Sequence, residues 1–187
     1  MKTTRSVLSG LARISFLAVA FLAFGNAFCQ SSEARNTSLK GNFSMAALSA
    51  WQNHSMEKVA DFYAYLNLLS DENTGSELKV EIIKNIEDLF QSKNVSVIDF
   101  SGISKNNNLE QLLKIVSAQK IGFKISDQIN FTEVSENSWS VNYLVEVTQN
   151  GKKSVVHVNQ TIWLSQSQKA FGAKSKTVWR QVLGEMK

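Results

Sequence analysis

Few residues in this sequence are of the types that carry catalytic chemistry. The chain holds one cysteine, Cys29, and two histidines, His54 and His157. A cysteine nucleophile is excluded if Cys29 leaves with an N-terminal signal or carries a lipid, and the Gly-x-Ser-x-Gly signature of serine hydrolases does not occur. A histidine catalyst needs a partner carboxylate and shelter from water. The sequence therefore supplies no recognisable catalytic motif.

Residues 71–77 superficially resemble a calcium-binding loop, with Asp71 and Asn73 as oxygen ligands. The pattern fails, because Gly75 stands where a ligand side chain is needed and Ser76 stands where the glycine turn is needed. We interpret the stretch as an ordinary turn between helices with Ser76 as a helix cap. We predict no metal site and no cofactor.

The first 29 residues have the three parts of a secretory signal peptide. Basic residues precede an apolar run from Ile14 to Phe24, and small and polar residues follow it. The run is shorter than the roughly 20 apolar residues needed to span a bilayer. We predict cleavage after Cys29, which leaves Gln30 as the first residue of a periplasmic or extracellular protein.

Two other outcomes at this boundary stay open. Cleavage after Ala27 also fits the small-residue rule. A bacterial lipoprotein signal also ends in a cysteine that becomes lipidated, but it wants a small residue where this chain has Phe28. Contact with a membrane is expected only if Cys29 is lipidated.

Charge argues against a nucleic-acid partner. Three of the 20 Lys and Arg lie in the signal, which leaves 17 basic against 16 acidic residues. No basic footprint for nucleic acid survives. Residues 30–43 are polar and are expected to form a flexible lead-in, and residues 44–187 are long enough for one domain with its own core. Without an internal disulfide, this domain depends on packing for its stability.

Two helices are predicted in the first half of this domain. Apolar residues recur at steps of three and four over residues 44–69, and Ser55 is placed to cap a second segment there. After the turn, Ser76 is placed to cap another helix, with Glu77 in its first turn. The apolar face of that helix consists of Leu78, Ile82, Ile86 and Leu89. We expect it to pack on a sheet face built from Phe123, Ile125, Val141 and Tyr143 or their immediate neighbours.

A strand, a third helix and four antiparallel strands are predicted next. Val95–Phe100 is β-branched and short, and Asn108 is placed to cap the helix. The apolar period then changes to two over residues 121–131, 139–147, 155–164 and 177–183, with Asn150-Gly151 as a strong hairpin signal. Helices gathered before a strand meander predict an α+β domain with one sheet face covered.

This order resembles the nuclear transport factor 2-like superfamily, which includes the polyketide-cyclase-like (SnoaL-like) proteins. The resemblance covers about residues 44–186. It rests on Val59-Ala60-Asp61-Phe62-Tyr63, Leu89-Phe90, Val97-Ile98-Asp99-Phe100 and Trp139-Ser140-Val141-Asn142-Tyr143. It implies a cone, in which N-terminal helices pack on one face of a curved, mainly antiparallel sheet. A pocket opens at the wide end, and the outer sheet face often pairs with another copy.

Enzymes of this superfamily place an Asp, His or Tyr inside the cone. Carried to this sequence, the resemblance implies a short set of interior candidates: Asp61, Tyr63, Tyr65, Asp99 and Tyr143. A carboxylate drawn into the pocket would have a raised pKa that suits proton transfer. For Asp61 we favour the interpretation that it faces water or caps a turn, because buried unpaired carboxylates are rare. No histidine lies near it in sequence to complete a dyad.

A second candidate surface lies on the strand over residues 155–164. His157, Asn159, Thr161 and Trp163 alternate with the more apolar row Val156, Val158, Ile162 and Leu164. If the apolar row meets the helices, the first four residues form the outer face. A polar face carrying a Trp could bind a sugar or a second protein surface, and we favour a homodimer or envelope-protein contact, or plain exposure to solvent, over a glycan.

We therefore expect an exported binding or assembly module without catalytic activity. The alternative is a small cyclase or isomerase that uses an Asp or Tyr inside the cone. A pocket with convergent polar groups favours the enzyme, or a small apolar ligand, whereas an interior filled by Phe and Leu side chains favours the binding module.

Overall fold

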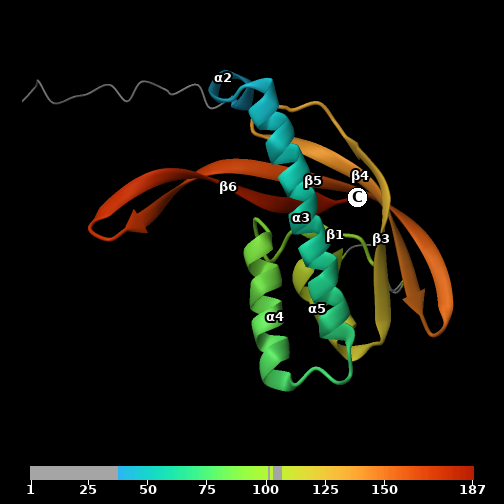
Figure 1. The fold of residues 1–187 in the computed structure, drawn as a ribbon. Helices are drawn as coiled ribbons and strands as arrows, with labels where there is room; N and C mark the ends of the chain where they lie inside the picture. Colours follow the sequence, from blue (N-terminus) through green and yellow to red (C-terminus); the bar gives the residue numbers. More distant parts are fainter. Residues whose placement is uncertain (1–37, 101, 103–106) are drawn as a thin grey trace, which may run out of the picture. The chain divides into compact units, whose positions relative to one another are not determined.

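The computed structural model describes residues 38–100, 102 and 107–187. Within these residues the helices come first and the long strands follow, in an α+β arrangement that confirms the predicted fold class (Figure 1). The predicted signal peptide, its cleavage site and Cys29 lie outside the described residues. The helices are α2 (Leu39–Asn42), α3 (Met45–Ser70), α4 (Ser76–Leu89) and α5 (Leu109–Ala118). The strands are β1 (Ser96–Val97), β2 (Asn107–Asn108), β3 (Ile121–Phe131), β4 (Ser138–Gln149), β5 (Lys152–Phe171) and β6 (Lys174–Met186).

The four long strands form one antiparallel sheet in the order β3-β4-β5-β6, curled around α3 (Figure 1). The pairing register shifts between Ile125 and Ile129 in β3, and between Gln160 and Ile162 in β5. Such irregularities bend a strand and increase its twist. The curled sheet therefore gives the cone-like half-barrel that encloses the core.

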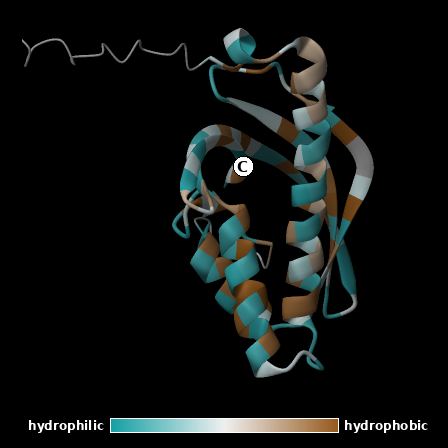
Figure 2. Cartoon of the chain, turned by 60° about the vertical axis from the view of Figure 1, so that its left-hand side comes forward, coloured by the Kyte–Doolittle hydropathy of each residue, from teal (hydrophilic) through white to brown (hydrophobic). Residues whose placement is uncertain are grey.

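Side-chain alternation places one sheet face in the core. β4 alternates buried and half-buried residues along nearly its whole length, and hydrophobic and hydrophilic segments alternate along the strands in Figure 2. The predicted hairpin at Asn150-Gly151 is confirmed, with φ of 52° and 75° at the two residues. The predicted strand over 95–100 is wrong in extent, because only Ser96–Val97 pairs, with Asn107–Asn108.

Helix boundaries confirm some predicted caps and correct others. Asn108 caps α5 in a reciprocal arrangement with Gln111, as predicted. Ser55 does not begin a new segment, because α3 is one continuous helix in which the Ser55 hydroxyl donates back to the Gln52 carbonyl. The N-cap of α4 is Gly75 and not Ser76, which is the first residue of that helix.

The prediction of a flexible lead-in over residues 30–43 is wrong for its last residues. Leu39 is fully buried in the core, and its N–H donates to the Glu136 carbonyl at 2.7 Å. Lys40 pairs with Glu133 in the same loop. The domain therefore begins before residue 44. Burial of the single leucine of this polar stretch holds the segment against the core.

Packing of α4 differs from the prediction. This helix contacts α3, α5 and β6, whereas α3 contacts β3. Leu78 is 55% exposed, but Ile82 and Ile86 are buried. At the end of α4, Phe90 pairs with Leu183 of β6, and the Gln91 N–H donates to the Leu183 carbonyl. The apolar face of α4 therefore covers the other helices and the β6 edge, because the longer α3 already occupies the concave face.

Candidate functional site

Buried aromatic rings pack against one another inside the cone, between α3 and the sheet. We call them the ring cluster: Phe62, Tyr63, Phe90, Phe100, Phe123 and Tyr143. None is more than 7% exposed. Their centroids lie 5.0–6.0 Å apart along the contacts from Phe90 through Phe62 and Tyr63 to Phe100, Phe123 and Tyr143. Most pairs meet edge to face, the arrangement that aromatic rings favour.

Two of the predicted interior residues meet in this cluster. The hydroxyls of Tyr63 and Tyr143 lie 3.3 Å apart. The Tyr143 hydroxyl also donates to Oε1 of Gln160 at 3.4 Å, and Nε2 of Gln160 donates to the Gly184 carbonyl at 2.8 Å. This chain of hydrogen bonds satisfies polar groups that lie far from water, which is the usual condition for burying them.

The tyrosine pair is poorly suited to proton abstraction. Burial, reinforced by the neighbouring Tyr143, raises the pKa of Tyr63 well above its usual value. Burial likewise raises the pKa of Tyr143, although its hydrogen bond with Tyr63 acts in the opposite direction. Both hydroxyls therefore stay protonated at neutral pH, where they act as hydrogen-bond donors and not as bases.

The other interior candidates are more exposed than this pair. Asp61 is exposed on α3, as the favoured interpretation expected, and Tyr65 is half-buried. Asp99 is half-buried in the segment after β1. Tyr63 and Tyr143 are thus the two candidates that lie in the core, and the contact between their hydroxyls joins them directly.

Gln160 belongs to the interior but was not singled out in the sequence. It is fully buried and lies in the row of β5 that also carries Val158 and Ile162. A polar residue at a position whose neighbours in the row are all apolar is the signal that would have identified it. Its amide links the tyrosine pair of the interior to the backbone of β6.

The outer sheet face carries the second set of predicted residues. His157 is exposed, and Asn159, Thr161 and Trp163 are half-buried, while Val158, Ile162 and Leu164 of the opposite row lie in the core. We call His157, Asn159, Thr161 and Trp163, together with Leu144 and Val155, the outer surface. Val155 is 61% exposed, so the outer surface carries an uncovered aliphatic side chain.

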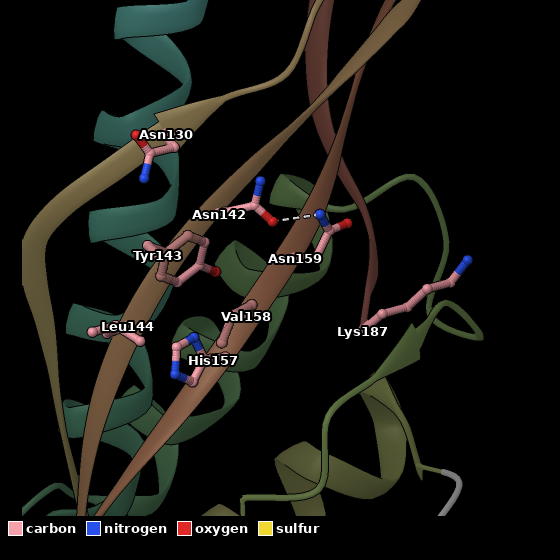
Figure 3. A pocket seen from close by; sticks show the side chains of 8 residues that line it. All are labelled: Asn130, Asn142, Tyr143, Leu144, His157, Val158, Asn159 and Lys187. Atoms are coloured by element: carbon pink, nitrogen blue, oxygen red, sulfur yellow. Dashed lines mark hydrogen bonds between the residues drawn. The ribbon is translucent and has the colours of Figure 1, made fainter.

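An asparagine row crosses the outer surface. Asn130, Asn142 and Asn159 are register partners on three neighbouring strands. The Asn159 side chain donates to Oδ1 of Asn142 at 2.6 Å, and the two point toward each other in Figure 3. Cross-strand polar pairs of this kind support the sheet. The row gives the surface hydrogen-bonding groups beside its apolar ones.

A shallow groove of about 230 Å³ follows the asparagine row, and among the residues that the structure describes no Asp or Glu side chain lines it. Within the described lining of this groove, His157 therefore has no acidic side chain to orient it as a catalytic base. Figure 3 shows it beside Leu144, its register partner on β4. The residues lining the groove are Asn130, Asn142, Tyr143, Leu144, His157, Val158, Asn159 and Lys187.

Part of the Trp163 side chain packs against the sheet itself. Its indole lies over Gly184 of β6 so closely that a Cβ at residue 184 would stand 2.5 Å from Nε1 of Trp163. Glycine at this position therefore permits the close approach of ring and backbone. Trp163 contributes to the outer surface, but part of its area is already used in packing on β6.

The acidic stretch after α3 forms a turn. Oδ1 of Asp71 accepts a hydrogen bond from the Asn73 N–H at 2.9 Å, in the manner of an Asx turn. In the part of the chain that the structure describes, no three His, Cys, Asp or Glu side chains lie close enough together to hold a metal ion.

Comparison with known proteins assigns no family to the chain. No protein-family profile matches it, and no curated protein is similar enough in sequence to be matched to it.

Proposed function

We propose that this protein is an exported binding or assembly module without catalytic activity, built on a nuclear transport factor 2-like cone. Its working part is the outer surface of the sheet, and the partner we favour is a second copy of the chain, ahead of another envelope protein. The ring cluster is the observation that carries the proposal, because its buried rings pack together inside the cone, whereas an enzyme needs a pocket with convergent polar groups there.

Export is inferred from the N-terminal sequence. Basic residues, a short apolar run and small residues occur in the order that a secretory signal requires. The absence of cysteine after Cys29 is compatible with an oxidising compartment, because the domain holds no thiol to oxidise. The superfamily assignment is supported by the helices on the concave side of a curled antiparallel sheet.

The composition of the outer surface supports a protein contact. Val155 is exposed, Leu144 and Trp163 are half-buried, and the asparagine row supplies donors and acceptors between them. Apolar side chains beside polar groups that can pair are typical of interfaces between subunits. A sheet face related to itself by a two-fold axis meets the requirement that both copies use the same patch.

Sedimentation velocity of the exported protein over a concentration series tests this proposal. The test variant is Val155→Lys, because Glu146 stands opposite residue 155 on β4 and an opposite charge there preserves the strand. The control is Val80→Lys, which changes a 64% exposed valine on α4. We expect the wild type and the control to dimerise, and Val155→Lys to dimerise at least about tenfold more weakly. A wild-type protein that stays monomeric at every concentration contradicts a self-paired outer surface.

A further inference from the structure

The end of the β5–β6 hairpin projects from the body of the domain as an arm, which we define as residues 165–180. Figure 1 shows its strands extending away from the helices to a tight turn. The two strands stay paired from Ser165 and Arg180 to Phe171 and Lys174. Gly172 in the turn has a φ of 63°, which favours glycine. Most of the arm is exposed to solvent.

The charged residues of the arm are all basic, and they lie on one face of it. The arm contains Lys169, Lys174, Lys176 and Arg180 and no acidic residue. Lys169 stands opposite Lys176, Lys174 opposite Phe171, and Arg180 opposite Ser165. Register partners in an antiparallel pair share a face, so all four cations lie on what we call the basic face.

The opposite face of the arm is neutral and internally bonded. Gln168 donates to the Thr177 hydroxyl at 2.9 Å and accepts from the Ser175 hydroxyl at 3.1 Å. These bonds tie the two strands together beyond the core.

Two features of the basic face are unfavourable in isolation. Lys169 and Lys176 are like charges directly opposite each other, which destabilises a strand pair. Phe171 at the tip is 49% exposed. The two ammonium groups lie 5.8 and 5.9 Å from the Phe171 ring centroid, which offsets part of the repulsion. In the described residues no carboxylate forms an ion pair with Lys169, Lys174 or Lys176.

We propose that the arm docks on a bilayer surface that carries anionic lipid. Phe171 enters the boundary between headgroups and acyl chains, while Lys169, Lys174 and Lys176 contact lipid phosphates. Phe171 stands at the extremity with Lys174 opposite it, and Lys169 and Lys176 form the next pair on the same face, so the ring can enter the interface while the cations beside and behind it reach lipid phosphates. A single-stranded nucleic acid is a poorer fit, because it requires several aromatic platforms for successive bases and the basic face has one.

This inference goes beyond the proposed function and does not need a lipid on Cys29. The outer surface and the arm are different parts of β5, and each is tested by its own measurement. If the arm does not bind membranes, self-association through the outer surface is unaffected. If the outer surface does not self-associate, membrane binding by the arm is unaffected.

Vesicle co-sedimentation of the exported protein tests the inference, using phosphatidylcholine vesicles with and without phosphatidylglycerol. The test variant replaces Lys169, Lys174 and Lys176 by Gln. The control replaces Lys84, Lys120 and Lys124 by Gln, which removes the same charge from exposed positions outside the arm. We expect binding only to anionic vesicles, weakened about a hundredfold in the test variant, because each lysine near an anionic surface contributes about fivefold. The control should bind as the wild type does, apart from a small effect of net charge.

Phe171→Ser separates the apolar contribution from the charge. We expect this variant to lose the binding that persists at high salt, since salt screens the lysines and not the ring. Circular dichroism of each variant verifies that the domain is folded. Equal loss of binding in the test and control variants overturns the inference, as does failure of the wild type to bind anionic vesicles. Binding of single-stranded DNA through the same lysines, without vesicle binding, also overturns it.

Discussion

The side-chain amide of Asn67 pairs with both backbone groups of Phe123. Its Nδ2 donates to the Phe123 carbonyl at 2.9 Å, and its Oδ1 accepts from the Phe123 N–H at 2.8 Å. Phe123 lies on β3, one of the two edge strands of the sheet. One residue of α3 therefore occupies backbone groups that an exposed edge would offer to another chain, a protection that natural sheets need. The same contact fixes α3 across the concave side, beside the ring cluster.

Replacing Asn67 by Ala should destabilise the domain by about 1–2 kcal/mol, because two hydrogen bonds to the backbone are lost. The control is Asn53→Ala, which makes the same change at an exposed position on the same helix. Denaturant unfolding measures the free energy, and hydrogen exchange of the Phe123 amide should accelerate only in the first variant. Equal midpoints for the two variants would show that the bonds to Phe123 contribute nothing to stability.

The free energy of unfolding at high pH should depend on the ionisation of Tyr63 and Tyr143. The pKa values of Tyr63 and Tyr143 are raised in the folded state, so the unfolded chain loses these protons first as pH rises past about 10. The contribution of each group is thus fully present below that pH and is lost above it. Each tyrosine lowers the free energy of unfolding by at most about 1.4 kcal/mol per pH unit in that range.

The double variant Tyr63→Phe/Tyr143→Phe isolates this effect, because lysines titrate alike in both proteins. We expect its free energy of unfolding to fall less steeply above pH about 10 than that of the wild type. Chemical denaturation at a series of pH values gives the two slopes. Identical slopes would mean that the two hydroxyls ionise at the same pH in the folded and the unfolded chain, which contradicts raised pKa values in the folded state.

A buried and an exposed residue of α4 together test how this helix packs on the core. Ile86 is fully buried and Leu78 is 55% exposed, although both were assigned to the same apolar face. Ile86→Ala should cost about 2–5 kcal/mol of unfolding free energy. Leu78→Ala should change it by less than about 0.5 kcal/mol. A denaturant midpoint unchanged by Ile86→Ala would show that this face of α4 is not part of the core.

Local sequence signals predicted the elements that local physics determines. The cap at Asn108, the turn at Asn150-Gly151 and the alternation along β4 depend on neighbouring residues, and all three are present. The apolar row of β5 was also sufficient to separate its two faces. The outer face was therefore predictable in its members, although its partner was not.

Features determined by tertiary contacts were missed. Leu39 is a single apolar residue whose burial depends on a loop almost a hundred residues away. The arm lacks an apolar period because both of its faces are largely exposed, so the predicted strands ended at 164 and began at 177. Gln160 breaks the apolar row that contains it, and its two hydrogen-bond partners come from different strands.

Cysteine cross-linking tests the self-paired outer surface most directly. The exported chain, if it starts at Gln30, has no cysteine, so single replacements Leu144→Cys, His157→Cys and Asn159→Cys each introduce one thiol on the outer surface. Val80→Cys places one on α4 as the control. A disulfide needs Cα atoms within about 7 Å, which two copies related by a two-fold axis provide near that axis. We predict disulfide-linked dimers for at least one outer-surface variant under mild oxidation, and none above background for Val80→Cys. Cross-linking no greater than that of the control in all three variants would contradict pairing through this surface.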